Sequence, residues 1–375
     1  MAKVERILIV GGGIAGLAVA TALHRHDFAP EIVERSPAWP AVGAGIALHA
    51  NGVRVLRALG LGEAIDRAAA VLPRWGFFDQ HGELLCETNL EDFWTEVGPC
   101  LGITRVRLQE ILLTGAAVVP HRLGMAVTSV TQKDNWVSVG FSDGSSGDFD
   151  LVVGADGIYW TTRKHTIGSV SPSYAGQMAW RSVVLIRPRG LTDLMILLGE
   201  SCFFGLVPVG DGQTYGFGGV DVKRFVDPLE GRLERFRRRF AAFDGPVPEY
   251  LAALERDDQL HVGPIEWMEL EQWHSGRVVL IGGAAHAAPP HMGEGGSMAL
   301  EDAVVLAEIL HSADTVGSVL DLYVARRRPR AEWVQEQSRI AAQAWVLSPA
   351  VRNAALRERG DEMFRDRYRP LIPVA

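Results

Sequence analysis

A strand, a glycine-rich turn and a helix open the chain, and this combination constrains the fold more than any other feature. The apolar run Ile7 to Val10 is followed by glycines in the spacing G-x-G-x-x-G. Gly11 serves the tight turn, Gly13 lets a pyrophosphate approach the backbone, and Gly16 allows the helix to pack closely. The next apolar run ends at Glu34, whose carboxylate can accept hydrogen bonds from both hydroxyls of a ribose. The pattern predicts a dinucleotide site on a Rossmann-like βαβ unit; the alternative is a glycine-rich turn beside a solvent-facing glutamate.

The acidic end of this second strand also indicates which dinucleotide fits. A carboxylate here selects a free ribose 2′-hydroxyl, as in NAD or the adenosine half of FAD, and disfavours NADP. Three further residues of the unit are candidates for cofactor contacts: Ile14, Ala15 and Arg35. An exposed surface arginine is the simpler interpretation of Arg35.

A second glycine-rich turn lies within residues 277–310. The β-branched run Val278 to Ile281 predicts a short buried parallel strand. A long loop follows, in which Pro290 excludes a helix. Three glycines let the loop backbone approach a ligand closely: Gly293, Gly295 and Gly296. Ser297 is expected to cap the next helix, whose free N–H groups and positive dipole end would face an electron-rich ligand atom; an ordinary strand-to-helix connection is the alternative.

A third strand ends in an acidic turn. Leu151 to Gly154 has the pattern of a buried strand, and Asp156 and Gly157 follow it. A carboxylate at the carboxyl end of a parallel strand lies where doubly wound sheets bind their ligands, although a helix N-cap is the alternative. Gly45 lies in another turn that leads into a helix and is a further candidate for cofactor contacts. Arg105 stands at a helix start, where it can donate to a phosphate or carbonyl.

Two stretches have the pattern of an antiparallel sheet rather than of βαβ units. Short strand-like runs separated by turns fill residues 71–98 and 166–268. The expected fold class is α/β, with a Rossmann-like domain built on a parallel sheet, an inserted substrate domain with an antiparallel or mixed sheet, and C-terminal helices. The expected cofactor domain is discontinuous, with residues 1–70, 99–165 and 269–340, while residues 341–375 form a C-terminal helical segment.

Proline positions set several expected helix boundaries. Asp227-Pro228 predicts the start of a helix with one apolar face. Pro329, Pro349 and Pro370 are expected to interrupt the helices near the end of the chain. The basic run from Ala325 to Arg330 is interpreted as a cluster of surface ion pairs.

Composition limits the classes of partner. The 375 residues are 47% hydrophobic and 22% charged, as in an ordinary soluble globular protein, and a net charge of -8 argues against general nucleic-acid binding. Three separated cysteines suggest neither a metal site nor a disulfide framework. Because we find no signal sequence and no apolar stretch long enough for a membrane span, we expect a cytoplasmic protein without nucleic-acid, membrane or metal partners. The sequence does not decide between a monomer and a homodimer.

Taken together, three separated segments resemble one family. Their order is GGGIAG with Glu34, then GADGIYWTTR at 154–163, then GGAAHAAPPHMGEGGSMALED at 282–302. This order resembles the single-component FAD-dependent aromatic hydroxylases of the para-hydroxybenzoate hydroxylase type, and the similarity extends to RRRPRAEWVQEQSR at 326–339. The three motifs are specific for the family, although not for a substrate.

The resemblance implies FAD as the cofactor and NAD(P)H as a transient co-substrate. The ADP half of FAD would be held by Gly11, Gly13, Gly16 and Glu34. Arg105 would contact the flavin side, and Asp156 with Gly157 would belong to the motif shared by FAD and NAD(P)H binding. The loop from Pro290 to Gly296 would wrap the isoalloxazine and present backbone N–H groups to it.

Two positions depart from the family pattern. Where the family usually has G-D-A-A-H, this chain has Gly283 in place of the aspartate. That aspartate normally holds the ribityl and ribose region, so Gly283 is expected to weaken FAD retention. The family favours serine where Trp160 stands, so a bulky aromatic is expected to alter the approach of nicotinamide or substrate.

The activity implied by the resemblance is hydroxylation of an aromatic or heteroaromatic substrate with O2, through a flavin C4a-hydroperoxide. The antiparallel sheet would form one cavity wall, and strand alternation lets only about half of the candidate liners point inward. These liners are Trp180, Arg181, Phe203, Phe204, Tyr215 and Phe217. Arg181 is a candidate partner for a substrate carboxylate or phenolate, and Tyr215 and His291 are candidates for assisting deprotonation.

Other reactions remain open at this point. The same fold supports an epoxidase or a Baeyer-Villiger type oxygenase, and the departures at Gly283 and Trp160 leave room for a degenerate flavoprotein that binds a ligand without turnover. A halogenase is less consistent because the W-x-W-x-I-P element is absent. A disulfide reductase would need a second G-x-G-x-x-G and a redox cysteine pair, which the sequence lacks.

Overall fold

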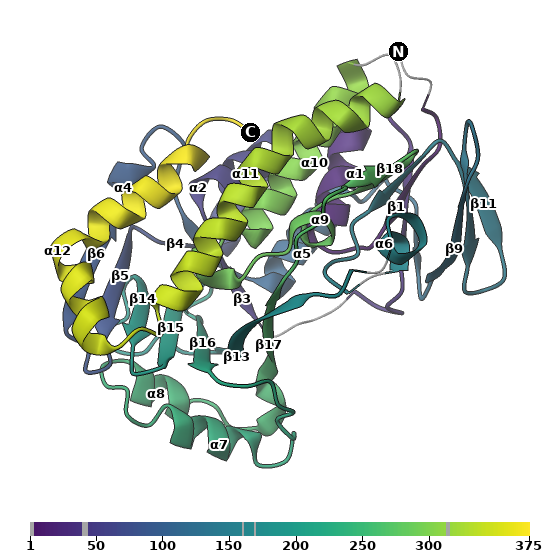
Figure 1. The fold of residues 1–375 in the computed structure, drawn as a ribbon. Coiled ribbons are helices and arrows are strands. Elements are labelled where there is room, and N and C mark those ends of the chain that lie inside the picture. The colour runs from purple at the N-terminus through teal and green to yellow at the C-terminus, as the bar shows by residue number, and fades with distance from the viewer. Residues whose placement is uncertain (1–3, 40–43, 160, 169, 313–315) are drawn as a thin grey trace.

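Two sheets organise the chain in the computed structural model, which describes residues 4–39, 44–159, 161–168, 170–312 and 316–375 (Figure 1). The first sheet has six strands in the order β18-β19-β12-β1-β2-β8. Their bounds are His274–Ser275, Val278–Leu280, Leu151–Gly154, Ile7–Val10, Pro30–Glu34 and His121–Leu123. All neighbours are parallel except β18 and β19. The strands that carry the three cofactor motifs, β1, β12 and β19, are therefore adjacent, and their carboxyl ends meet at one edge.

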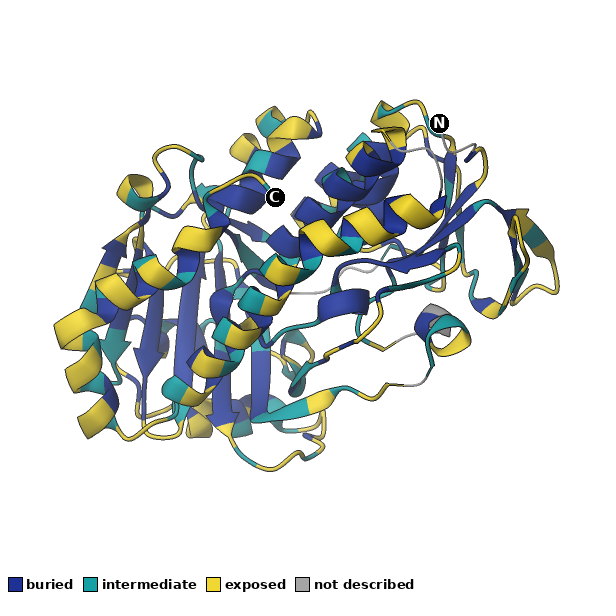
Figure 2. Ribbon diagram, turned by 45° about the horizontal axis from the view of Figure 1, so that its top comes forward, coloured by how far each residue is buried: buried dark blue, intermediate teal, exposed yellow. Residues whose placement is uncertain are grey.

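Alternate residues of β1 face two different cores, which explains its unbroken apolar run. Ile7 and Ile9 pack with helices α1 (Ile14–Arg25) and α10 (Gly295–Ser312) on one face. Leu8 and Val10 pack on the other face against a small antiparallel sheet. That sheet consists of β9 (Val127–Gln132), β10 (Val137–Phe141) and β11 (Ser146–Phe149). Figure 2 shows the strands buried and the outer sides of the helices exposed, as expected for a parallel sheet covered on both faces.

The second sheet is mixed and has the order β17-β13-β16-β15-β14-β5-β6. Its strands are His261–Trp267, Ser173–Val184, Thr214–Asp221, Cys202–Pro208, Leu194–Leu198, Arg74–Asp79 and Leu84–Asn89. Strands β14 and β5 are parallel, and the other neighbours are antiparallel. One face packs against α7 (Arg232–Arg239) and α8 (Val247–Ala252), while residues of the opposite face pack with α12 (Pro349–Tyr368).

A three-stranded sheet of β3 (Gly45–Leu48), β7 (Leu101–Thr104) and β4 (Ala70–Val71) joins these two layers. Strand β3 contacts β15 and β16, and it leads into α2 (Ala50–Ala58), while β7 leads into α5 (Arg105–Gly115). The remaining helices are α3 (Gly62–Ala68), α4 (Leu90–Phe93), α6 (Thr161–Thr166), α9 (Gly283–His286) and α11 (Val316–Ala344). Single 3-10 turns occupy Asp257–Gln259, Pro290–Met292 and Arg369–Leu371. Among the residues described, no helix is both long enough and apolar enough to cross a membrane.

The predicted fold class is confirmed, because a parallel cofactor-type sheet is combined with a mixed sheet and C-terminal helices. The division into domains at the residue numbers given above remains a prediction. One helix boundary is wrong: the helix expected at Asp227-Pro228 begins at Arg232. Its cap comes from a distant residue, because the carboxylate of Asp257 accepts the N–H groups of Gly231 at 2.9 Å and Leu233 at 2.7 Å.

The expected interruption at Pro329 is also wrong, since α11 runs through this residue. Arg327 and Arg330 on either side of the proline pair with Glu301 of α10 at 2.8 and 2.7 Å, and these contacts hold the helix in place. Arg327 is completely buried, which the expected surface cluster does not explain. Arg326 and Arg328 do form ion pairs with the exposed residues Glu308 and Glu332, at 3.3 and 3.7 Å. Pro349 does mark a boundary, because it opens α12.

Candidate active site

The three glycines after β1 have the geometry that a dinucleotide requires. Gly11 has a φ of 108°, and a Cβ built on it would lie 2.7 Å from the carbonyl oxygen of Ala155. A Cβ on Gly16 would lie 1.8 Å from the carbonyl oxygen of Gly11, so no other residue allows this close helix packing. A Cβ on Gly13 would meet no atom within 4 Å. Gly11 and Gly16 therefore shape the turn, and Gly13 leaves open space beside it.

Glu34 is held at the end of β2 by backbone donors. Its carboxylate accepts the N–H of Gly12 at 2.8 Å and the N–H of Ser36 at 2.9 Å. These bonds fix the carboxylate beside the glycine turn and leave lone pairs for a ribose. Arg35 is exposed, which agrees with the simpler interpretation of a surface arginine. Ile14 and Ala15 form the first turn of α1.

The acidic turn after β12 touches both neighbouring motifs. A Cβ on Gly11 would lie 2.8 Å from the Cα of Asp156, and a Cβ on Gly283 would lie 3.7 Å from the Cα of Gly157. The second distance is an ordinary van der Waals contact, so a side chain at position 283 has room. The structure thus brings the three sequence motifs together at one sheet edge. Trp160, expected to alter access, lies outside the described residues.

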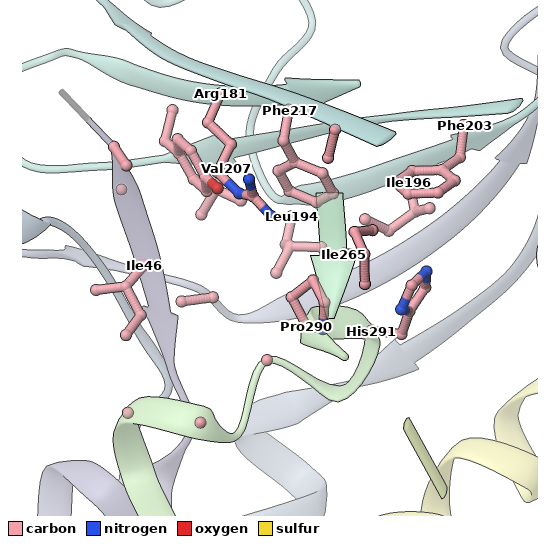
Figure 3. Close-up of a pocket in the computed structure, with 18 of the residues that line it drawn as sticks. Ile46, Arg181, Leu194, Ile196, Phe203, Val207, Phe217, Ile265, Pro290 and His291 are labelled. Atoms are coloured by element: carbon pink, nitrogen blue, oxygen red, sulfur yellow. The ribbon is translucent and has the colours of Figure 1, made fainter. Parts of the chain in front are cut away.

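A cavity of about 300 Å³ lies between the second sheet and the loop that precedes α10 (Figure 3). Figure 3 shows Arg181 and Phe217 reaching toward it from the sheet, with Pro290 and His291 on the opposite side. Glycines from two predicted cofactor loops line its edge: Gly45, Gly293, Gly295 and Gly296. The cavity therefore opens directly onto the backbone that was expected to face the flavin.

Helix α10 begins at Gly295, three residues earlier than an N-cap at Ser297 predicts. The carbonyl oxygen of Glu294 accepts the N–H of Met298 at 2.8 Å, so Glu294 precedes the helix and Ser297 lies inside its first turn. The prediction of Ser297 as the N-cap is wrong, because two glycines without side chains can enter the helix. Ser297 is fully buried, and a Cβ on Gly295 would meet nothing within 4 Å. The free N–H groups of the helix start at Gly295 and Gly296, at the cavity edge.

Two arginines and a tyrosine form the polar side of the cavity. Arg181 and Tyr215 both line the cavity, and burial raises the pKa of Tyr215 while the charges of Arg181 and Arg105 oppose that rise. The side chain of Arg105 is exposed to the open cavity, but the protein around it removes much of its hydration, and this desolvation lowers its pKa. Neither arginine forms an ion pair with a carboxylate among the described residues. The cavity thus contains positive charge that an acidic ligand group can neutralise.

His291 is a buried imidazole on the opposite wall. Neither ring nitrogen has a hydrogen-bond partner within the described part of the chain. Burial, followed by the charges of Arg181 and Arg367, lowers its pKa to about 3, so the ring is neutral at physiological pH. The ring packs edge-on against Phe203 at 5.5 Å and Trp345 at 4.8 Å. A buried imidazole without a partner can bind a ligand that supplies one.

The sheet presents four of the six expected liners to the cavity: Arg181, Phe203, Tyr215 and Phe217. The prediction that Trp180 and Phe204 line the cavity was wrong. The alternation of side chains along a strand turns both toward the core shared with α7 and α8. The sequence interpretation missed Trp75 and Trp345, which also line the cavity. Trp345 lies at the end of the long helix α11, where no motif marks it. The roles assigned to Arg181, Tyr215, His291 and the cofactor residues remain predictions.

Comparisons with known proteins agree with this geometry. The family described as FAD binding domain matches residues 5–338. Aurachin C monooxygenase/isomerase from Stigmatella aurantiaca is 34% identical over 328 residues, or 87% of this chain and 85% of the relative. FAD-dependent urate hydroxylase from Klebsiella pneumoniae is 30% identical over 338 residues, or 87% of this chain and 86% of the relative. The crystal structure of Klebsiella pneumoniae HpxO complexed with FAD and uric acid has a TM-score of 0.90 and 26% identity, covering 97% and 96% of the two chains.

The parallel sheet and its glycine turn fit a dinucleotide cofactor, and the family match and the relatives give the class, a flavoprotein oxygenase. The chain belongs to the FAD binding domain family, among the class A flavin monooxygenases, and is an FAD-dependent monooxygenase. The suspected family is thereby confirmed, and the alternative of a flavoprotein without turnover is set aside. The residues present fit FAD, because the carboxylate of Glu34 is fixed beside the turn and Gly13, Gly157 and Gly295 leave space.

Proposed function

We propose that the cavity binds a small aromatic or heteroaromatic compound with an acidic or hydrogen-bond-accepting group and hydroxylates its ring. The observation that carries this proposal is that Arg181 and Tyr215 both face the cavity from the sheet. The positive charge of Arg181 has no carboxylate partner among the described residues, so a carboxylate or phenolate is its natural ligand. The uric acid complex of HpxO and the urate hydroxylases support a small polar heterocycle as the kind of substrate.

The protein would contribute binding, orientation and exclusion of water. Phe203, Phe217 and Trp345 provide apolar surfaces against which a planar ring can pack. Arg181 would hold the acidic group, and the protonated hydroxyl of Tyr215 would donate a hydrogen bond to it. His291 would complete the orientation by a hydrogen bond. Its pKa of about 3 favours this role over proton abstraction.

FAD would lie across the sheet edge where β1, β12 and β19 end, and three groups of residues would hold it. The ADP half would contact the turn from Gly11 to Gly16 and the carboxylate of Glu34, while Arg105, Asp156 and Gly157 would contact the middle of the cofactor. The backbone from Pro290 to Gly296 would face the flavin, where the N–H groups of α10 stabilise negative charge. When bound, FAD supplies the redox chemistry that links NAD(P)H and O2 to the substrate. We propose the same domain division as above and a monomer or homodimer.

The proposal can be tested by following NADH and NADPH oxidation with a panel of hydroxylated aromatic acids, quinolines and purines. We expect at least one compound to accelerate oxidation and to gain one oxygen atom. Arg181→Gln should raise the KM of that compound by about 10-fold to 100-fold, the cost of losing a charged hydrogen bond of ~1.5–3 kcal/mol. Arg189→Gln is the matched control, since the Arg189 side chain is 97% exposed. Equal effects of both substitutions would overturn the assignment of Arg181.

A further inference from the structure

The end of the chain lies beyond the family match at residue 338, yet it is fastened firmly to the rest of the protein. Figure 1 shows α12 in yellow beside β5 and β6. Side chains of α2 and α11 donate to backbone carbonyl groups of residues 367–372. These donors are Trp333 to Arg367 at 3.0 Å, Arg330 to Leu371 at 2.8 Å, and Arg54 to Ile372 at 2.9 Å. The last turn of α12 and the residues that follow it are therefore held in place.

Tyr368, the last residue of α12, connects this fixed position to the cofactor loop. Its hydroxyl donates to the carbonyl oxygen of Met292 at 2.8 Å, and the bond is buried. Its ring stacks on His49, with ring centroids 4.8 Å apart and an angle of 18° between the planes. His49 in turn supports the loop, because its Nε2 lies 3.2 Å from the position of a Cβ on Gly293. Tyr368 and His49 thus form a layer directly behind the loop.

The carbonyl group of Met292, which accepts the bond from Tyr368, lies directly before the left-handed residue of the turn. Gly293 follows with a φ of 69°, and the N–H of Gly293 donates to Pro290 at 2.8 Å. Helix α10 starts two residues later, and Gly293, Gly295 and Gly296 line the cavity. A rotation of the peptide after Met292 would therefore redirect the first N–H groups of α10.

We propose that Tyr368 is a positioning residue for the flavin: its bond to Met292 holds the turn that aims the N–H groups of α10. The C-terminal helix is then a working part of the cofactor site. This inference depends on FAD binding and not on the identity of the substrate. A loop that is held in the binding conformation pays less for ordering when FAD binds, so loss of the bond lowers the apparent affinity.

Tyr368→Phe tests the inference because it removes one hydroxyl and keeps the ring stack. We expect FAD titration, followed by fluorescence, to show a Kd about 10-fold higher, since the loop loses the bond that holds it in the binding conformation. We also expect a more negative midpoint potential of the bound flavin, because misdirected N–H groups stabilise the reduced anion less. Trp333→Phe is the matched control: it removes a hydrogen bond to the same end of α12 and leaves the bond from Tyr368 to Met292 in place.

If Tyr368 only stabilised the fold, Tyr368→Phe and Trp333→Phe would change the FAD affinity and the midpoint potential equally. Wild-type affinity and potential in Tyr368→Phe would overturn the proposal, as would an equal change in Trp333→Phe at the same loss of apoprotein Tm. If Tyr368→Phe does not fold, hydrogen exchange of the wild-type protein provides the test. We expect FAD to slow exchange in residues 364–369 together with residues 292–298; slowing confined to 292–298 would contradict the connection.

Discussion

The side-chain amide of Asn51 joins two buried carboxyl groups, donating to Glu294 at 3.1 Å and to Glu301 at 3.1 Å. The two carboxyl groups have different surroundings. Glu301 pairs with Arg327 and Arg330, whereas the basic side chain described next to Glu294 is His49, at 3.9 Å. Burial lowers the pKa of His49 to about 3, so this partner is neutral. Burial also raises the pKa of Glu294 to about 8, and the group keeps its proton at neutral pH.

A pH dependence of stability follows for Glu294→Gln. The folded protein keeps a proton that the unfolded chain loses above its ordinary pKa of 4.5, so the free energy of unfolding falls between pH 4.5 and about 8. The slope can reach ~1.4 kcal/mol per pH unit. Glutamine keeps the contact with Asn51 and does not titrate. The stability of the variant relative to wild type should therefore increase with pH in denaturant titrations at pH 5 to 8, while exposed Glu336→Gln should show no trend. A constant difference would disprove the raised pKa.

His291 should not titrate during turnover. Because burial lowers its pKa to about 3, the pH profile of kcat between pH 5 and 8 should contain no step from this residue. His291→Phe preserves the aromatic packing against Trp345 and removes both ring nitrogens, so we expect a higher KM with an unchanged profile. A step in the wild-type profile that disappears in His291→Phe would show instead that the histidine exchanges a proton.

Gly283→Asp should tighten FAD binding. A Cβ at this position meets only ordinary contacts, the nearest at 3.7 Å, and the restored carboxylate can accept a hydrogen bond from the cofactor. We expect a gain of ~1–3 kcal/mol in FAD affinity by fluorescence titration. Gly283→Ala fills similar space without an acceptor and should leave the affinity unchanged. If alanine tightens binding as much as aspartate does, backbone rigidity and not the carboxylate is responsible.

Trp345→Ala should enlarge the cavity and weaken the protein. Trp345 is buried, packs against Phe77 and Phe203, and lines the cavity. Its removal should cost ~3–5 kcal/mol of unfolding free energy. It should also let larger rings stimulate NAD(P)H oxidation, with more H2O2 released per turnover because water enters. The stability and the size preference of Trp345→Phe should lie between those of the wild-type protein and Trp345→Ala. An unchanged size preference in Trp345→Ala would place the substrate elsewhere.

The sequence predicted those parts of the site that depend on backbone shape. Glycine spacing and strand ends indicated Gly11, Glu34, Asp156 and the loop before α10, because such features are local in the chain. Contacts made by distant segments could not be predicted in this way. Tyr368 and Trp345 reach the site only through the packing of α11 and α12, and Asp257 caps a helix that begins 25 residues earlier. Burial of Arg327 likewise depends on carboxylates of another helix.

The central claim is that this cavity hydroxylates an aromatic ring with the help of Arg181. The most direct measurement is mass spectrometry of the product after incubating the FAD-loaded protein with NAD(P)H, ¹⁸O2 and the compound that most accelerates cofactor oxidation. We expect one ¹⁸O atom per product molecule, and far less labelled product with Arg181→Gln than with Arg189→Gln. NAD(P)H oxidation that yields only H2O2 with every aromatic compound of the panel would contradict the claim.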